Sequence, residues 1–590
     1  ENSMEFSTLY RTKPMNEFSE ADINSTVKIA GWVENIRDHG GVSFIDLRDM
    51  YGVMQVVMRD TTLLDGISKE DCLSIEGIVE KRDEDTINPK IATGTIEVEA
   101  KKVITLGKVR QPLPFEIQTS KEIREDKRLQ YRFLDLRNEK VKDNIIFRSK
   151  VIAYLRQVMS EMGFLEMQTP ILCASSPEGA RDYVVPSRVH KGKFYALPQA
   201  PQQYKQLLMV SGIDKYFQVA PCFRDEDARA DRSPGEFYQL DMEMAFANQE
   251  DVFAVLEDVL PPIFAKYGIY HEASTAPFKR IPYREAMEKY GSDKPDLRIS
   301  LLVQDATEAL ADCGFEPFAG KTVKAVVAPD FKGTRKQIDK MCAEVEVISG
   351  QKAYWFKMDE NGELTGGIAK FLQEKKDAVI EALGLKNGDF VALSAGTLGA
   401  AQKTAGVIRK VVGTSFDGYM KKECYEFCWV VDFPMYEIGE ESGELEFCHN
   451  PFSMPQGGVE ALENQDPLEI LAYQYDLVCN GIELSSGAVR NHDPEIMVKA
   501  FQLVGLGEED VKAKFPAMYN AFCYGAPPHA GIAPGVDRMV MLIAGEDSIR
   551  EIIPFPMNKN AQDVMMGAPA EVDEKQLREV HIKISAPEKQ

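Results

Sequence analysis

The chain has 590 residues, 44% of them hydrophobic, which is more than one hydrophobic core usually serves, so we expect several domains. Its formal net charge of −24 excludes a protein that binds nucleic acid through overall positive charge, so such contacts would need local clusters of Lys and Arg. No run of 18 apolar residues occurs, which excludes an ordinary transmembrane helix.

The first part of the chain has strand patterns. Apolar residues alternate or cluster in five short segments, at 27–31, 42–47, 53–58, 75–79 and 96–104. Five such strands in succession favour a small barrel of the OB type, a common platform for single-stranded nucleic acid. Pro112 and Pro114 end the pattern. We therefore predict a barrel domain at 1–115 and a hinge at 116–140.

A long helix is predicted next, because apolar residues recur at helical spacing over 145–162 and Gly163 stands at the position of a C-terminal cap. Apolar segments over 193–244 alternate with polar loops, which predicts an antiparallel sheet. The segment 294–420 has its own helix and strand signals, and none of the residue clusters that suggest catalysis or binding falls in it. We predict an α+β multidomain fold whose central domain has two parts, 141–290 and 421–560, around an inserted α+β domain at 291–420, followed by a polar tail at 561–590.

The ten cysteines form no CxxC pair. Cys424 and Cys428 have CxxxC spacing, but no histidine pair follows at the distance typical of metal ligands. Reduced thiols explain them better than a metal site, and this favours a cytoplasmic location.

A charged segment begins at Phe223-Arg224-Asp225-Glu226-Asp227 and runs on to Gln239. Its flanks, 216–219 and 240–246, resemble strands, which places the charges on a loop between two antiparallel strands. Such a run is ordinarily a solvated hairpin. Two further segments argue for chemistry instead.

The first of these segments is 525–538, rich in Gly and Pro and followed by an apolar helix at 539–544. Glycine permits close backbone approach. Arg538 at the head of a helix is unfavourable for the helix dipole unless it meets an anion such as phosphate. The second segment, 163–170, directly follows the long helix and ends in Thr169-Pro170, which is typical of an interface element.

Together these segments resemble the three motifs of class II aminoacyl-tRNA synthetases. Thr169-Pro170 resembles motif 1, the segment around Arg224 motif 2, and Gly535-Val536-Asp537-Arg538 motif 3. The segments 177–183, 202–205 and 290–298 narrow the resemblance to the bacterial aspartyl enzymes, over nearly the whole chain. The resemblance implies a homodimer that activates L-aspartate with ATP and transfers it to tRNA, with an N-terminal anticodon-binding OB domain and a GAD-type insertion.

The resemblance also implies how ATP is bound. Activation is an in-line attack of a carboxylate on the α-phosphorus, so the site must offset repulsion between two anions. Arg224 is expected to bridge the aspartate carboxylate and the α-phosphate, Arg538 to bind the γ-phosphate, and Glu226 to accept from the adenine amino group. Both arginines are the expected catalytic residues. The other expected ATP contacts are Asp225, Glu483, Gly535, Val536 and Asp537.

Asp476 and Glu483 are the Mg²⁺ ligands that the resemblance implies. Mg²⁺ prefers a few carboxylates together with phosphate oxygens. Without the resemblance, a pair of surface carboxylates would be the better interpretation.

The aspartate pocket needs cations. Arg490 can form a bidentate pair with a carboxylate and Lys205 can add a point charge, whereas asparagine would leave both cations unpaired. By resemblance, Glu178 and Asp241 hold the α-ammonium group, Gln202 helps to position it, and His449 lies over the substrate beside Arg224. His449 is also open to interpretation as a buried structural histidine.

For tRNA, the resemblance assigns the anticodon to Arg37, Phe44 and Gln55. Phe44 would stack on an unpaired base, worth about 1–3 kcal/mol; the alternative is a core phenylalanine of the barrel. His39 and Asp85 lie where the family discriminates between tRNAs, and a histidine there is associated with enzymes that also charge tRNA for asparagine. The alternative is an ordinary loop histidine.

Two rival classes stay open. One is another class II enzyme, for asparagine or lysine, or an amide-forming ligase without tRNA; a lysine pocket would need carboxylates instead of Arg490. The other is a non-enzymatic regulator that resembles a synthetase, which predicts loss of Arg224, Arg538 or Glu483. All three residues are present.

Overall fold

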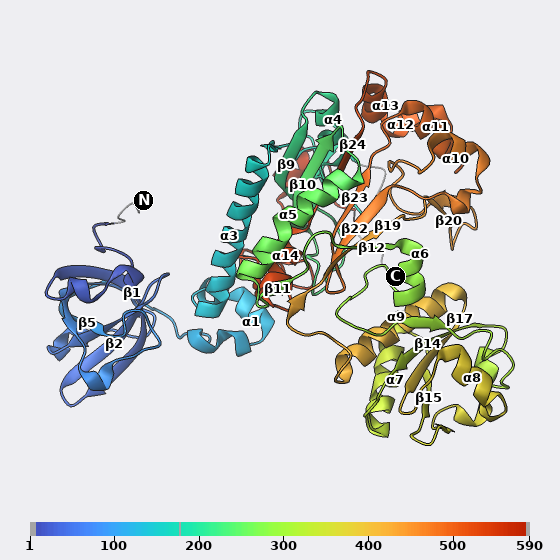
Figure 1. The fold of residues 1–590 in the computed structure, drawn as a ribbon. Coiled ribbons are helices and arrows are strands. Elements are labelled where there is room, and N and C mark those ends of the chain that lie inside the picture. Colours follow the sequence, from blue (N-terminus) through green and yellow to red (C-terminus); the bar gives the residue numbers. More distant parts are fainter. Residues whose placement is uncertain (1–6, 176–178, 586–590) are drawn as a thin grey trace. The chain divides into compact units, whose positions relative to one another are not determined.

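The computed structural model describes residues 7–175 and 179–585. The chain forms two compact units, 1–139 and 140–590. Each is described by itself, and Figure 1 shows the elements of both. Within the described ranges, no helix is long and apolar enough to cross a membrane.

The first unit holds a closed five-stranded barrel in the order β1-β2-β3-β5-β4. All five predicted strands are present: β1 (Thr26–His39), β2 (Val42–Arg48), β3 (Val53–Met58), β4 (Cys72–Lys81) and β5 (Ile96–Gly107). Alternate side chains such as Ile29, Val33, Ile45 and Leu47 fill the barrel core. β1 runs further than the predicted segment 27–31. The prediction missed its second half because that half is polar. An irregularity in the pairing of β1 with β2 falls between Val33 and Asn35.

The segment predicted as a hinge contains two short helices, α1 (Glu125–Gln130) and α2 (Arg132–Asp135). The fully buried Asp135 accepts hydrogen bonds from Ser120 (2.6 Å), Arg128 and Arg132. Because a buried carboxylate is stable only when its charge is compensated, these bonds fix the segment's conformation.

The second unit is built on an eight-stranded sheet in the order β12-β19-β22-β23-β24-β10-β9-β6. The two end pairs, β12–β19 and β6–β9, are parallel and the other pairs are antiparallel. The strands are β6 (Leu165–Glu166), β9 (Lys215–Phe223), β10 (Glu236–Ala245), β12 (Lys279–Pro282), β19 (Phe427–Val431), β22 (Gln474–Cys479), β23 (Ile482–Val489) and β24 (His529–Ile532).

Three helices share one hydrophobic core with this sheet: α3 (Glu139–Glu161), α5 (Gln249–Tyr267) and α14 (Val536–Ala544). The predicted long helix and the predicted helix after Arg538 are thus present. The prediction that strands and loops alone fill 193–244 is wrong, because α4 (Gln202–Val210) lies there. Its run of Gln, Lys, Leu and Met consists of unbranched or γ-branched residues, which favour a helix.

A separate five-stranded sheet lies within the segment predicted to be an insertion, in the order β13-β14-β17-β15-β16. Its helices α7 and α9 share one core cluster, whereas α8 contributes to a second. Alternate residues of β14 belong to different clusters, so helices cover both faces. The elements are β13 (Val303–Asp305), β14 (Thr322–Ala328), β15 (Tyr354–Met358), β16 (Leu364–Thr365), β17 (Phe390–Gly396), α7 (Arg335–Ser349), α8 (Lys376–Leu383) and α9 (Leu398–Ser415).

Smaller elements complete the second unit. Helices α11 to α13 contribute to a cluster of buried aromatic residues next to α4. These smaller elements are β7 (Val184–Pro186), β8 (Phe194–Ala196), β11 (Glu272–Ala273), β18 (Cys424–Tyr425), β20 (Tyr436–Ile438), β21 (Leu445–Phe447), α6 (Tyr283–Glu285), α10 (Gly458–Asn464), α11 (Pro494–Gln502), α12 (Glu508–Lys514), α13 (Pro516–Phe522) and α15 (Glu574–Glu579).

Candidate active site

One cavity of about 380 Å³ in the second unit brings together Arg224, Arg490 and Arg538. The first follows β9, the second follows β23, and the third lies in the first turn of α14. The two strands lie near each other because the order of the sheet places β9, β10, β24 and β23 side by side, and α14 packs against the same sheet. The folded chain therefore gathers guanidinium groups that are far apart in the sequence.

The predicted hairpin loop between β9 and β10 lies along this cavity. The Arg224 Nε atom donates to the Gln199 carbonyl oxygen (3.2 Å), and its guanidinium carbon lies 4.9 Å from the centre of the Phe237 ring. Glu226 also lines the cavity. Asp225 does not: it is exposed and pairs through its backbone with Arg181. A merely solvated hairpin is thus the wrong interpretation of the loop, although Asp225 lies away from the cavity.

Arg538 occupies the predicted position at the head of α14. Its Nε atom donates to the Asp231 carbonyl (3.1 Å) and its Nη1 atom to the Glu483 carbonyl (2.9 Å). Gly535, the residue before α14, lines the cavity with a φ of −71°, so no positive φ requires glycine there. The nearest atom to a Cβ at this position would be 3.8 Å away. The protein's own packing therefore does not demand glycine at 535.

The other two residues of this motif face the protein. The Val536 side chain is fully buried in the core, which leaves only its backbone for a ligand. Asp537 borders the cavity, but its carboxylate oxygens accept from Arg148 Nη1 (2.5 Å) and from the Tyr238 backbone N–H (3.0 Å). These contacts tie α3, β10 and α14 together and give Asp537 a structural role.

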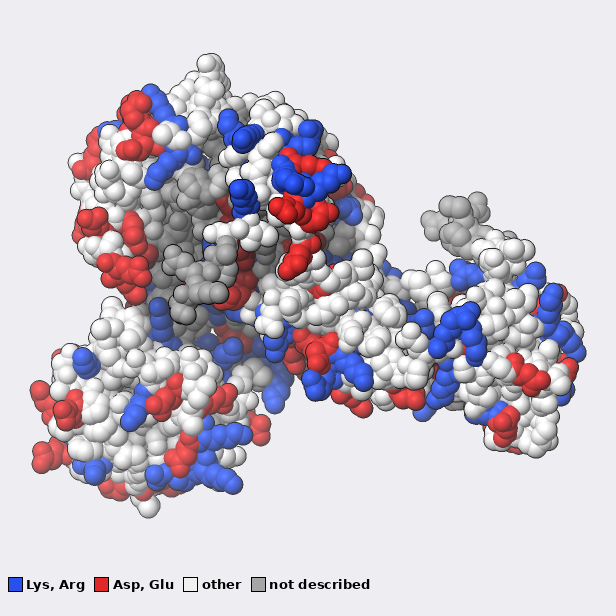
Figure 2. Space-filling model, turned by 180° about the vertical axis from the view of Figure 1, so that it is seen from behind, with Lys and Arg blue, Asp and Glu red and all other residues white. Residues whose placement is uncertain are grey.

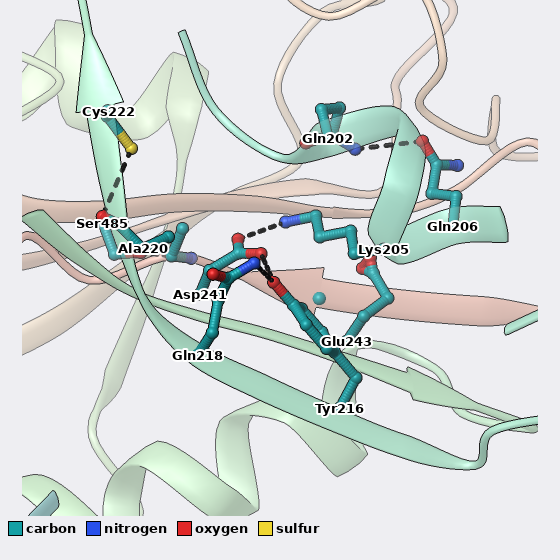
Figure 3. Close-up of polar contacts among 12 residues, drawn as sticks. Gln202, Lys205, Gln206, Tyr216, Gln218, Ala220, Cys222, Asp241, Glu243 and Ser485 are labelled. Atoms are coloured by element: carbon teal, nitrogen blue, oxygen red, sulfur yellow. Dashed lines mark hydrogen bonds and ion pairs between the residues drawn. The ribbon is translucent and has the colours of Figure 1, made fainter. Parts of the chain in front are cut away.

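Lys205 and Asp241 form a buried ion pair in the same cavity. The ammonium group lies 2.8 Å from Asp241 Oδ1, and the Tyr216 hydroxyl donates to Oδ2 (2.8 Å). Gln218 in turn donates to the Tyr216 hydroxyl (2.6 Å), and Figure 3 shows the chain of contacts. Burial raises the pKa of the Asp241 carboxyl, against the effect of Lys205. The charge of Lys205 is thus partly balanced before any substrate binds.

Arg490 is held by a residue that the sequence analysis missed. Its Nε atom lies 3.2 and 3.3 Å from the two carboxylate oxygens of Glu243, and both side chains are almost completely buried. The two terminal amino groups of Arg490 form no hydrogen bond with described residues, and the residue lines the cavity. A Cβ at Gly531 would lie 1.9 Å from Glu243 Oε1, so this glycine makes room for the carboxylate. The sequence feature that could have drawn attention to Glu243 is an acidic residue between two methionines of β10.

Gln202 lines the same cavity, and Gln206 links it to His529 behind the cavity wall. Gln202 Nε2 donates to Gln206 Oε1 (3.1 Å), and Gln206 Nε2 lies 3.0 Å from His529 Nε2. His529 is fully buried, and burial lowers its pKa. The sequence analysis did not single out either Gln206 or His529.

Asp476 and Glu483 lie together on neighbouring strands. The Ser486 hydroxyl is 2.7 Å from Asp476 and 2.8 Å from Glu483. Burial and the adjacent Glu483 raise the pKa of Asp476 well above its usual value. Burial also opposes ionisation of Glu483, but hydrogen bonds from Asp476 and Ser486 hold its pKa below the usual value. Asp476 is buried, so a pair of surface carboxylates is the wrong interpretation.

These two carboxylates fit Mg²⁺ by their chemistry. Two adjacent anions repel each other unless a proton or a cation lies between them. No group of three or more His, Cys, Asp or Glu side chains in the described part of the chain forms a metal site. A pair of carboxylates that needs phosphate oxygens to complete the coordination suits Mg²⁺.

His449 lines a second cavity of about 940 Å³, which shares Gln202, Arg224 and Glu226 with the first. Its side chain is exposed, so a buried structural histidine is the wrong interpretation. Its ring packs edge-on against Phe433, with centroids 5.1 Å apart. Glu178, the other expected ligand of the α-ammonium group, lies outside the described residues.

The barrel has a concavity of its own, of about 480 Å³, that contains all five residues predicted to contact tRNA. Arg37 Nη2 donates to Gln55 Oε1 (3.1 Å), and the rings of His39 and Phe44 lie 5.9 Å apart. Phe44 is half-buried and is not part of the barrel core, so that alternative is wrong. Asp85 lies on the same wall.

Arg82 also lines this concavity, and the sequence analysis missed it. The residue is buried, and its Nη2 atom has no hydrogen-bond partner among the described residues. Figure 2 shows Lys and Arg side chains in local groups among Asp and Glu, which fits local basic contacts on an acidic protein.

Comparison with known proteins decides the family. Residues 124–559 match the family described as "tRNA synthetases class II (D, K and N)", and residues 27–106 match "OB-fold nucleic acid binding domain". The chain is 53% identical over 585 residues to the aspartate–tRNA ligase of Streptomyces coelicolor, which covers 98% of this chain and 99% of that protein. The chain belongs to the aspartate–tRNA ligase family.

A relative whose name includes both tRNA(Asp) and tRNA(Asn) has the same sequence identity to this chain. The aspartate–tRNA(Asp/Asn) ligase of Zymomonas mobilis is 53% identical over 589 residues, covering 98% of each protein. A crystal structure of a putative aspartyl-tRNA synthetase from Leishmania major has a TM-score of 0.58 and 20% identity, covers 94% of each chain, and thus shows the fold. The family and the α+β fold class that the sequence predicted are confirmed.

Membership of the aspartate–tRNA ligase family bears on the rival interpretations. The protein is an aminoacyl-tRNA synthetase by family, and Arg224, Arg538 and Glu483 line one cavity. The cations Lys205 and Arg490 in the same cavity argue against a lysine pocket. The two names of its relatives leave the choice of tRNA open.

Proposed function

We propose that the protein joins L-aspartate to the 3′ end of tRNA(Asp), with ATP cleaved to AMP and diphosphate. The observation that carries the proposal is the gathering of Arg224, Arg490, Arg538 and Lys205 in one cavity. Such a cavity suits two anions that must react with each other.

Activation requires a carboxylate oxygen of aspartate to attack the α-phosphorus of ATP. Arg224 lines the cavity and bridges the two anions, which lowers their repulsion and stabilises charge on the phosphoryl oxygens. Arg538 binds the terminal phosphate as a planar fork, and Glu226 accepts from the adenine amino group. The backbone at Gly535 leaves space for the nucleotide.

Asp476 and Glu483 hold Mg²⁺ in this proposal. When bound, the metal neutralises phosphate charge. Glu483 thus contributes to both the metal site and the ATP site, since its backbone carbonyl also orients Arg538.

Aspartate is selected by charge. The two free amino groups of Arg490 form the bidentate pair with the substrate's side-chain carboxylate, and Lys205 adds a second cation. Asparagine offers an amide that leaves these buried cations unpaired, which costs far more than a missing methyl group. Asp241, Gln202 and Glu178 hold the α-ammonium group, and His449 covers the substrate from the neighbouring cavity.

The barrel concavity binds the anticodon. Phe44 stacks on a base, and Arg37 and Gln55 provide polar contacts. His39 and Asp85 lie on the same concavity, and we propose that His39 allows the enzyme to charge tRNA(Asn) as well as tRNA(Asp).

The remaining assignments follow the family. The catalytic domain spans 141–290 and 421–560, with the insertion at 291–420, the barrel at 1–115, the hinge at 116–140 and the tail at 561–590. The enzyme forms a homodimer through the motif 1 segment, where Leu165 is exposed, as is Leu172 just after the segment. It works in the cytoplasm, which suits cysteines that are all free in the described chain.

Exchange of labelled diphosphate into ATP tests activation. The protein with Mg²⁺ should support exchange with aspartate and not with asparagine or lysine. No exchange with aspartate would contradict the proposal. Charging of purified tRNAs with GUC and GUU anticodons in parallel tests the choice of tRNA, and acceptance of aspartate by the GUC species alone would refute the role of His39.

A further inference from the structure

A third cavity of the second unit, of about 570 Å³, adjoins the ATP cavity on the side of Arg538. Four residues line both cavities: Arg229, Asp231, Glu483 and Arg538. The third cavity also has walls from the inserted domain, including Lys294, Arg298 and Lys410. In Figure 2, Lys and Arg side chains gather where the inserted domain adjoins the rest of the second unit. The inserted domain therefore contributes charge directly beside the nucleotide site.

The side chains of the third cavity divide into paired and unpaired groups. Arg298 is neutralised by Asp296, with a bond of 2.8 Å. The carboxylates of Asp231 and Glu483 lie 3.9 and 3.8 Å from Arg538, and Asn144 donates to Glu546 (2.9 Å). Asp547 is a further acid on the wall.

Lys410 differs from these groups. It is exposed on α9, and its ammonium group forms no ion pair with any described residue. Among the residues that the structure describes, the ammonium group of Lys294 has only one ion-pair contact, a long one of 3.6 Å with Asp293. Two cations of the inserted domain are therefore available to an anion that reaches this cavity.

The chemistry of activation indicates which anion that is. The attacking carboxylate oxygen forms a bond to the α-phosphorus, and the bond from that phosphorus to the bridging oxygen breaks. The bridging oxygen departs with the electron pair as part of diphosphate. In an in-line displacement the leaving group lies opposite the nucleophile. The residues proposed to bind the substrate aspartate, among them Lys205, Asp241 and Arg490, line the first cavity and not the third. The third cavity therefore lies on the side of the leaving group.

We propose that the third cavity receives the departing diphosphate, and that Lys410 and Lys294 of the inserted domain bind it. Arg538 and Arg229, which line both cavities, carry the diphosphate from the one to the other. This inference rests on the proposed function, because diphosphate forms only if the protein activates an amino acid with ATP. It gives the inserted domain a role in the reaction: to hold and release this product.

Diphosphate exchange with Lys410→Ala and Lys410→Glu tests the inference. The KM for diphosphate should rise about twofold to fivefold in Lys410→Ala, the range expected of one exposed ion pair, and further in Lys410→Glu. The KM for aspartate should change less than that for diphosphate. Titration of diphosphate into the protein without ATP should show the same order of affinities, and added salt should shrink the differences.

Lys403→Ala is the matched control, since Lys403 lies two turns earlier on α9, is exposed, and lines neither cavity. An unchanged KM for diphosphate in both Lys410 variants, or an equal rise in Lys403→Ala, would overturn the inference. So would a rise in the KM for tRNA alone, which would assign the cation to tRNA phosphates. Absence of exchange in the wild-type protein would instead refute the proposed function itself.

Discussion

Replacement of Arg490 by lysine separates folding from recognition of aspartate. In the structure one nitrogen of Arg490 is committed to Glu243, at 3.2 and 3.3 Å, while the two terminal amino groups are free for a ligand. Lysine keeps the positive charge but has one ammonium group, which serves either Glu243 or the substrate. Because Glu243 is fully buried and needs a counter-charge, the lysine should remain with Glu243.

The magnitude follows from the bonds that are lost. Two hydrogen bonds to a charged group are worth about 1.5–3 kcal/mol each, so the loss is about 3–6 kcal/mol. The kcat/KM for aspartate in Arg490→Lys should then fall about a hundredfold to ten-thousandfold. Steady-state diphosphate exchange measures this value, and thermal unfolding should show little change.

Arg409→Lys is a suitable control, since Arg409 is buried in the inserted domain and donates to the backbone carbonyls of Leu301, Asp296 and Ile299. This variant should lose thermal stability and keep its relative activity for aspartate over asparagine. A loss of less than about tenfold in kcat/KM for aspartate in Arg490→Lys would refute the assignment of Arg490.

Four further changes have expected outcomes. Gly535→Ala should leave the thermal midpoint unchanged, since no protein atom crowds the new Cβ, and raise the KM for ATP; a normal KM for ATP would show that no ligand approaches this backbone. Arg148→Met should destabilise the protein by about 3–5 kcal/mol in denaturant unfolding, because it leaves the Asp537 carboxylate buried without its cation. Phe44→Ala should weaken tRNA binding by about 1–3 kcal/mol in charging assays and leave diphosphate exchange intact, whereas a fall in exchange would point to a folding defect. His529 has a pKa below its usual 6.5, so the unfolded chain binds a proton more readily and stability should fall as the pH drops below 6.5; this part of the pH dependence should be absent in His529→Gln.

The positions of several site residues were predictable because local sequence fixes them. The alternation of apolar residues predicted the barrel strands, and the positions of Phe44 and Gln55 on the outward face follow from the same period. Arg37 lies on that face because of the irregularity in β1 after Val33, which strict alternation does not predict. The charged run after Cys222 between two apolar segments predicted a hairpin loop, and the apolar stretch after Arg538 predicted a helix. In each case the pattern spans one element and its neighbour in the chain.

Other residues depended on contacts between distant segments. Glu243 has no local feature that marks it as the partner of Arg490, because the two meet only when β24 pairs with both β10 and β23. Asp537 belongs to the same motif as Arg538, yet the packing of α3 turns it to Arg148. The helix α4 was also missed, although it carries Lys205.

The sequence by itself determined the family, the barrel strands, the long helix before Gly163 and the residues that bring charge to the reaction, because periodicity and short motifs are properties of neighbouring residues. Only the tertiary structure decided which charges are already paired, at Lys205 with Asp241 and Arg490 with Glu243, and which remain available, at Lys410. The physical reason is that the effect of a charge depends on its burial and on its partners in space, and these are set by segments that lie 36 residues apart for Lys205 and Asp241 and 247 residues apart for Arg490 and Glu243.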